Sequence, residues 1–154
     1  MDIARNLKIE SVLRLHPTPP WHVAPEASVA DAVELMRDKS VGCVLVCVDR
    51  KIVGIFTERD LLRRVLARDR PLSGPVGEAM TLRPVTVHPK DSIATAIRRM
   101  EEGGYRHLPV VVDDKPVGIL SVKRVVHYLV EHFPATVYNL PPHSPSTLLR
   151  REGA

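Results

Sequence analysis

An internal repeat at a spacing of 64 residues is the feature of this 154-residue sequence that most limits its fold. The segment that starts at Gly54 reads G-I-F-T-E-R-D, and the segment that starts at Gly118 reads G-I-L-S-V-K-R. An ungapped repeat indicates duplication of one supersecondary unit, and two such units are expected to bury a shared core. The same spacing aligns further identical pairs: Val23/Val87, Pro25/Pro89, Ser28/Ser92, Ala32/Ala96, Met36/Met100, Val46/Val110, Asp49/Asp113 and Lys51/Lys115.

Within one copy, the pattern predicts the order strand, helix, strand, strand, helix. Ser28 is a good helix N-cap, and apolar residues recur at helical spacing as far as Met36. The nearly continuous apolar run V-G-C-V-L-V-C-V, which starts at Val41, fits a buried strand. The turn D-R-K and the run I-V-G-I-F complete a hairpin, and a second helix is expected from Thr57 to about Arg68. We therefore expect an α/β (α+β) fold of two β-α-β-β-α units, packed sheet to sheet or helix to sheet.

The repeat also predicts how the chain divides into parts. We place the first unit at 9–72, the second unit at 73–134 and a tail at 135–154. A connection rich in Pro and Gly joins the two units. The tail is rich in Pro and Ser, which is typical of a loose segment or of one that docks on a partner. Leu148 and Leu149 could anchor it.

The composition is that of a soluble globular protein. Hydrophobic residues make up 44% of the chain and charged residues 26%. No apolar run approaches the roughly 18 residues that a membrane helix needs. The N-terminal stretch M-D-I-A-R-N-L-K-I-E has no apolar signal-peptide core. These features predict a soluble, cytoplasmic protein that does not associate with membranes.

Residues that form disulfides, bind metals or catalyse reactions do not cluster in the sequence. Cys43 and Cys47 lie four positions apart in a predicted strand, so their Cα atoms would be roughly 13 Å apart, too far for a disulfide. We interpret both as free, buried apolar residues. The seven His residues are scattered without metal-ligand spacing, so no metal site is expected. There is also no recognisable nucleophile–base–orienter set and no Gly-rich phosphate loop, so no catalytic residue is predicted.

The net charge of +4 is compatible with an anionic partner. Aromatic residues are only 4% of the chain, and acidic residues lie within the densest basic run. A nucleic-acid surface would combine clustered Lys and Arg with interleaved aromatic residues. We interpret the run as the solvated face of one helix, which argues against nucleic acid and leaves small anions as ligands. The basic run comprises Arg59, Arg63, Arg64, Arg68 and Arg70.

The repeated motifs resemble those of a tandem cystathionine-β-synthase (CBS) domain pair, also called a Bateman module. The shared motifs are V-x-P-x-x-S-(V/I) before the first helix, the strand R-H-L-P-V-V-V, and a strand that ends in G-h-h-(S/T)-x-x-D. The resemblance covers about Ile9 to Phe133. It implies two α/β units that are related by a pseudo-two-fold axis and packed through their sheets. It also implies two clefts for adenine nucleotides or related adenosyl ligands, a homodimer shaped like a disc, and a role as a sensor without catalysis.

Thr57 and Asp60 have two interpretations. S/T-x-x-E/Q is the capping-box pattern, in which a hydroxyl and a carboxylate satisfy free amides at a helix start, and Asp60 gives a shorter variant of it. The resemblance implies instead that these two residues hold a ribose, because a carboxylate can accept hydrogen bonds from its hydroxyls. The two roles are compatible for Thr57 and compete for Asp60.

The resemblance further implies a phosphate clamp built from Arg106, His107 and Lys123, which it brings toward the cleft that carries Asp60. Arg offers a forked donor and Lys a point charge. The alternative is that Arg106 and Lys123 are solvated surface charges and that His107 is a hydrogen-bonded structural residue.

The resemblance also implies a slot for adenine on the first strand and at the start of the second. Gly42 would let the base approach the backbone closely. Trp21, the single Trp of the chain, either stacks on the base or packs in the core or at an interface. The matching residues are Pro20, Trp21, His22, Val41, Gly42 and Cys43.

The second copy departs from this pattern. Ser121 matches Thr57, but Arg124 stands where the carboxylate would be, so a ribose there would lack its acceptor. Gly42 and Cys43 take the positions of the two phosphate cations. We therefore predict one competent site per chain, for AMP, ADP or ATP, in a regulatory, energy-sensing module that acts on an unidentified effector protein. The alternatives are a ligand-free interaction scaffold and an S-adenosylmethionine binder, although S-adenosylmethionine has no phosphate for the clamp.

Overall fold

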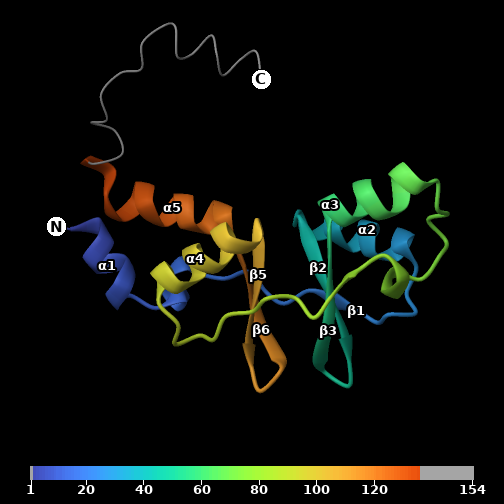
Figure 1. The fold of residues 1–154 in the computed structure, drawn as a ribbon, viewed down its shortest axis with the longest axis horizontal. Helices are drawn as coiled ribbons and strands as arrows, with labels where there is room; N and C mark the ends of the chain where they lie inside the picture. Colours follow the sequence, from blue (N-terminus) through green and yellow to red (C-terminus); the bar gives the residue numbers. More distant parts are fainter. Residues whose placement is uncertain (1, 136–154) are drawn as a thin grey trace, which may run out of the picture.

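The computed structural model describes residues 2–135, and its first repeat has the predicted order of elements (Figure 1). β1 (His22–Val23) precedes α2 (Val29–Lys39), and β2 (Cys43–Val48) pairs with β3 (Lys51–Thr57) as an antiparallel hairpin. A helical segment follows without a break. It consists of α3 (Glu58–Asp60), the π-helical turn η2 (Leu61–Val65) and the 3-10 turn η3 (Leu66–Arg68). Leu148 and Leu149, the predicted anchors of the tail, lie outside the described residues.

The second repeat copies the first. α4 (Ile93–Gly103), β5 (His107–Val112), β6 (Lys115–Ser121) and α5 (Val122–His132) follow one another, and the first strand is reduced to a bridge between Val87 and Val110. Two short helices, α1 (Ile3–Ile9) and η1 (Val12–Leu15), precede β1. The connection between the repeats contains η4 (Val76–Glu78) and β4 (Thr81–Leu82).

Local sequence signals explain why the two copies have the same form. The side-chain oxygen of Ser28 accepts from the backbone N–H of Asp31 at the start of α2. At the start of α4, the side-chain oxygen of Ser92 accepts from the backbone N–H of Thr95 in the same way. The two hairpin turns have positive φ at both central residues, as a tight two-residue turn requires. The pairs are Asp49 and Arg50 (φ 50° and 65°), and Asp113 and Asp114 (φ 51° and 64°).

The two sheets are completed by an exchange of strands. The first sheet has the order β1-β2-β3-β4, although β4 lies in the second unit of the chain, 73–134. Conversely, Thr18 lies in the first unit and bridges to Ile119 on β6 of the second. In Figure 1 the two hairpins lie side by side at the centre, and helices flank them on both outer sides.

The hydrophobic cores follow the same exchange. Val76, Ala79 and Met80 from the connection pack in the core of the first repeat, whereas Val12 and Leu15 pack in the core of the second. The first helical turn of each repeat, η1 or η4, thus packs in the core of the other repeat. The division into 9–72 and 73–134 describes the duplication, not the packing.

A third apolar cluster lies between the two sheets, as the predicted packing through the sheets requires. It comprises Cys43, Leu45, Cys47, Ile55 and Ile119. Both Cys residues in it are free and buried, which confirms their interpretation as core residues. Within residues 2–135, no helix is long and apolar enough to cross a membrane, and no group of three or more potential ligand residues could hold a metal ion.

Candidate functional site

A cavity of about 410 Å³ lies where the two repeats meet. Three segments form it: the end of β3 with the following helical turn, the connection around β4, and the turn between α4 and β5. Its lining combines apolar, hydroxyl and charged side chains, which is the composition of a small-molecule site. The lining residues from these segments are Ile55, Thr57–Asp60, Arg63, Arg64, Thr81–Val85 and Gly103–His107.

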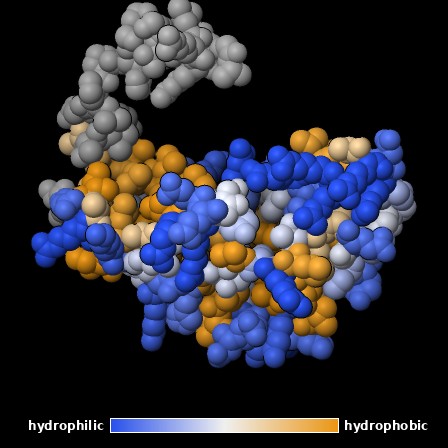
Figure 2. Space-filling model, in the orientation of Figure 1, coloured by the Kyte–Doolittle hydropathy of each residue, from blue (hydrophilic) through white to orange (hydrophobic). Residues whose placement is uncertain are grey.

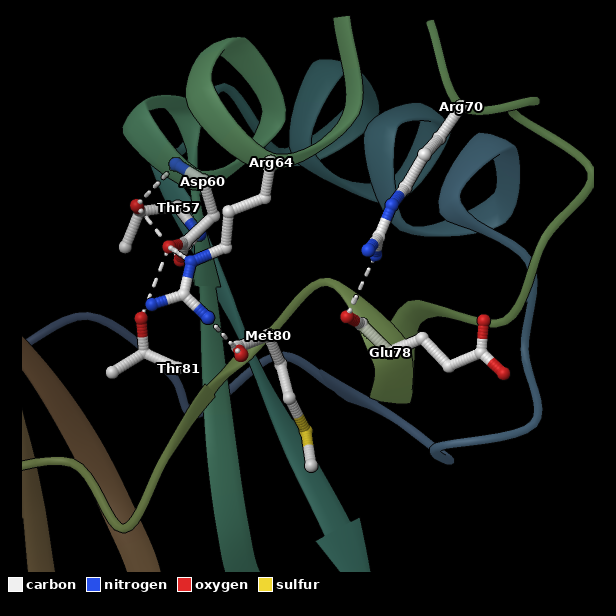
Figure 3. A network of polar contacts seen from close by, with 7 residues as sticks. All are labelled: Thr57, Asp60, Arg64, Arg70, Glu78, Met80 and Thr81. Carbon is white, nitrogen blue, oxygen red and sulfur yellow. Dashed lines mark hydrogen bonds and ion pairs between the residues drawn. The ribbon is translucent and has the colours of Figure 1, made fainter. Parts of the chain in front are cut away.

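Asp60 is the centre of a polar network at one end of this cavity (Figure 3). Its side chain is buried, and the residue is only 6% exposed. Its Oδ2 accepts from the backbone N–H and the hydroxyl of Thr57, both at 3.0 Å. The hydroxyl of Thr57 in turn accepts from the backbone N–H of Asp60 at 3.2 Å. The predicted capping box is therefore present, even with the shorter carboxylate.

The other oxygen of Asp60 faces the connection between the repeats. Oδ1 accepts from the hydroxyl of Thr81 at 3.0 Å and lies 3.4 Å from Nε of Arg64. Arg64 also donates from Nη1 to the carbonyl oxygen of Met80 at 2.9 Å. The helical segment after β3 is thus tied to the connection by one carboxylate and one guanidinium, as Figure 3 shows.

The helical geometry at this site is irregular. Residues Leu61–Val65 form a π-helical turn immediately after Asp60. Such turns occur often at functional sites, because the extra residue changes where neighbouring side chains point. Arg63 and Arg64 lie in this turn and line the cavity. The sequence pattern predicts one continuous helix here and contains no signal for the π-turn.

The charge of the cavity lining is predominantly positive. Its carboxylates are Glu58 and Asp60, and Asp60 is already engaged by the network. The side chain of Arg59 donates to the carbonyl oxygen of Gly104 at 3.2 Å, which links the helical turn of the first repeat to the second. Anionic ligands are favoured by such a lining. Its arginines are Arg59, Arg63, Arg64, Arg83 and Arg106.

His107 lies at the start of β5 and is half-buried. Burial lowers the pKa of its imidazole from the ordinary value of 6.5, while the charge of Glu58 opposes that effect and Arg106 adds to it. A methyl group on Gly42 would come within 2.9 Å of Nε2 of His107 and within 2.6 Å of Oε1 of Glu58. Gly42 therefore permits the close approach of these two side chains, and a titratable imidazole lies at the cavity.

The structure brings together five of the residues that the sequence analysis proposes for the site. Gly42, Thr57, Asp60, Arg106 and His107 all line the cavity. The remaining predicted residues do not line it. Val41, Cys43 and Lys123 line a neighbouring cavity of about 460 Å³, and Pro20, Trp21 and His22 line neither.

Trp21 lies outside the lining of both cavities. It packs against the core of the first repeat, and the ammonium of Lys39 lies 4.3 Å from the centre of its ring. His22 contacts the carbonyl oxygen of Pro20 through Nδ1 at 3.1 Å. Cys43 is buried, and burial together with the charges of Glu58 and Asp60 raises the pKa of its thiol to about 12, so it stays a neutral apolar residue.

Sequence analysis missed the segment Thr81–Val85, which forms the wall opposite the Asp60 turn. At the spacing of the repeat, Pro84 and Val85 are the counterparts of Pro20 and Trp21. Pro84 and Val85 line the first cavity, whereas Pro20 and Trp21 line neither cavity. This difference has a physical cause: each connection crosses to the sheet of the other repeat, as Thr18 and β4 do, and no local pattern encodes that crossing.

Comparison with known proteins places the chain in a family. The sequence profile of the CBS domain matches residues 12–67 and again residues 76–131. The chain belongs to the CBS-domain family. The CBS domain-containing protein CBSX3 of Arabidopsis thaliana mitochondria is 35% identical over 112 residues, which are 68% of this chain and 54% of CBSX3. The CBS pair thus spans about half the length of that relative.

Solved structures confirm the fold expected for a CBS pair. CBSX2 in complex with AMP superimposes with a TM-score of 0.65 at 32% identity, and the match covers 79% of this chain and 96% of CBSX2. The CBS domain protein PAE2072 of Pyrobaculum aerophilum, also complexed with AMP, has a TM-score of 0.72 at 25% identity. That match covers 79% of this chain and 97% of PAE2072.

Proposed function

We propose that this CBS pair is a non-catalytic regulatory module that binds an adenine nucleotide in the cavity at Asp60. One observation carries the proposal. The cavity between the repeats combines a carboxylate and hydroxyls suited to a ribose with an Arg-rich lining suited to phosphate. AMP in two related CBS proteins, CBSX2 and PAE2072, supports the choice of an adenine nucleotide.

The ribose would bind at Oδ1 of Asp60. The hydroxyl of Thr81 and the guanidinium of Arg64 occupy this oxygen, whereas Oδ2 serves the capping box. A carboxylate offers about four acceptor directions. A ribose hydroxyl would therefore replace Thr81 or Arg64 at Oδ1 and leave the cap intact. In this way the ligand-binding role and the capping role of Asp60 are divided between its two oxygens.

The phosphate would bind near Arg106 and His107, which line the cavity from the second repeat. Arg106 is exposed, and within residues 2–135 its side chain makes no hydrogen bond or ion pair, so its guanidinium is available to a ligand. The base would lie against the apolar side chains of Leu82, Pro84 and Val85. S-adenosylmethionine would leave these cations without a phosphate, so AMP, ADP and ATP are favoured over it.

The second copy of the Thr57–Asp60 turn supports one nucleoside site per chain. Arg124 stands in place of the carboxylate, and Ser121 makes no side-chain cap hydrogen bond. No ribose acceptor equivalent to Asp60 is left in that turn.

Regulation would pass through assembly and through an effector protein. Leu62, Leu66, Val122 and Val126 expose 61%, 51%, 41% and 51% of their surface, and Leu62 and Val126 are counterparts in the repeat. Figure 2 shows apolar side chains over α5 and near the end of the helical segment that begins with α3. A second copy of the chain that is related by a two-fold axis would bury both sets at once. The bound nucleotide would then change the geometry of a homodimer that the effector recognises.

A ligand-free scaffold is the second candidate, and one observation favours it. Every acceptor direction of Asp60 already has a partner within the chain, so the turn is complete without a nucleotide. Binding and stability measurements separate the two candidates, because only the first predicts saturable binding and a higher melting temperature with nucleotide.

The test is isothermal titration calorimetry of the full chain with AMP, ADP, ATP and S-adenosylmethionine. Asp60→Asn should weaken nucleotide binding by about tenfold, because an amide group then replaces the charged acceptor for ribose. Asp91→Asn is the matched control, since Asp91 also accepts a backbone N–H (His88, 2.8 Å) and pairs with an Arg, but lies outside both cavities. If no adenosyl ligand binds, or if Asp60→Asn binds as well as the parent, the site is wrong.

A further inference from the structure

The cavity of about 460 Å³ beside the Asp60 cavity is lined by the second copy of the functional turn. Ser121, Lys123, Arg124 and His127 line it from the end of β6 and from α5. The backbone of this turn is built like the first, because the N–H of Val122 donates to the carbonyl oxygen of Arg106 at 3.0 Å. In the first copy, the N–H of Glu58 donates in the same way to the carbonyl oxygen of Gly42 at 3.1 Å. The second turn therefore keeps the form of a ligand site with a cation in place of the carboxylate.

The two cavities meet along a common wall. Gly42, Glu58, Arg106 and His107 line both of them. Glu58 and Arg106 are exposed, and Gly42 contributes no side chain to the wall. The phosphate groups of a nucleotide that leave the first cavity at Arg106 can therefore reach the second cavity without crossing an apolar barrier.

The charge of the second cavity is suited to phosphate. Lys123, Arg124 and His127 face it beside Arg106, and among residues 2–135 Glu58 is the one carboxylate that lines it. Within residues 2–135, the side chains of Lys123, Arg124 and His127 make no hydrogen bond or ion pair, and the hydroxyl of Ser121 makes none either. These cations are available to an anion, whereas the turn offers no acceptor for a ribose.

We propose that the second cavity is a subsite for the terminal phosphates of the nucleotide whose nucleoside occupies the first. This inference rests on the proposed function and extends it to ligand specificity. The β- and γ-phosphates of one molecule run past Arg106 to Lys123 and Arg124. AMP is too short to make these contacts, so the affinity should be highest for ATP, lower for ADP and lowest for AMP.

The test compares nucleotides by calorimetry at one fixed salt concentration, since contacts between exposed charges are screened. ATP should bind the parent chain at least about tenfold more tightly than AMP, with one molecule per chain. Lys123→Gln with Arg124→Gln should remove most of this preference and leave the affinity for AMP within about twofold. Lys90→Gln with Arg98→Gln removes the same charge from residues outside both cavities and should keep the preference.

Inorganic tripolyphosphate distinguishes a spanning ligand from a separate anion site. If ATP binds no more tightly than AMP, and tripolyphosphate binds together with AMP, the second cavity is an independent anion site and the proposal is wrong. Retention of the ATP preference by the Lys123 and Arg124 double variant would also overturn it, as would two ATP molecules per chain. Failure of the parent chain to bind any of AMP, ADP and ATP would instead refute the proposed function.

Discussion

Replacing Asp60 by Ala and by Asn should separate the structural role of its hydrogen bonds from that of its charge. Ala removes every acceptor from a residue that is only 6% exposed. The backbone N–H of Thr57 then has no partner at the helix start, and the hydroxyl of Thr81 and the guanidinium of Arg64 lose theirs. A lost cap costs about 1 kcal/mol and a buried donor left without a partner about 1–3 kcal/mol. We expect Asp60→Ala to lower the free energy of unfolding by about 3 kcal/mol.

Asn can keep most of the network. If its carbonyl oxygen faces Thr57, both donors of Thr57 retain an acceptor, and its NH₂ group can donate to the hydroxyl of Thr81, which then reverses direction. Only the ion pair with Arg64 is lost. The side chain of Arg64 is 45% exposed and still donates to Met80, so that pair contributes about 1 kcal/mol or less. We therefore expect a loss of about 1 kcal/mol for Asp60→Asn.

The assay is equilibrium urea denaturation without ligand, followed by circular dichroism and by the fluorescence of Trp21, the single Trp. With an m value of about 2 kcal/mol/M, Asp60→Ala should lower the midpoint by about 1.5 M and Asp60→Asn by about 0.5 M. Equal losses for the two variants would show that charge, not hydrogen bonding, stabilises the turn. A loss below about 0.5 kcal/mol for Ala would refute the network itself.

Three further measurements test other parts of the structure. Gly54→Ala should destabilise the chain by about 1–3 kcal/mol in urea denaturation, because the new Cβ would overlap Sδ of Met80 and lie 3.0 Å from the backbone oxygen of Thr81. Gly118→Ala, at the equivalent position, meets its nearest atom at 2.9 Å and should cost less. Burial lowers the pKa of His107 below 6.5, so the unfolded chain binds more protons and the free energy of unfolding should fall as the pH drops below 6.5. His107→Gln should flatten that dependence, and in the parent chain AMP should bind more tightly at pH 6 than at pH 7.5, because a phosphate favours the protonated imidazole. Leu62→Lys should convert a dimer to a monomer in light scattering after gel filtration, and a parent chain that is monomeric at micromolar concentration would refute the proposed interface.

The repeat in the sequence predicts the order of the main helices and strands and the type of fold. Ser28 and Ser92 cap equivalent helices, and both hairpin turns follow from residues that are adjacent in the chain. These features depend on contacts within a few residues, and the spacing of polar and apolar residues encodes such contacts directly. The capping box at Thr57 and the free, buried Cys43 belong to the same class of prediction.

The partners of Asp60 were decided by the tertiary structure alone. Thr81 is 21 positions away from Asp60, and it reaches Oδ1 because the connection between the repeats crosses to the sheet of the first repeat. The same crossing brings Pro84 to the candidate site and leaves its counterpart Pro20 outside it. The two copies have similar local patterns, so the sequence alone could not show which connection meets which turn. Pairing of β4 with β3 and burial of Val76 in the first core select the arrangement, because both depend on surfaces that exist only when the sheets have formed.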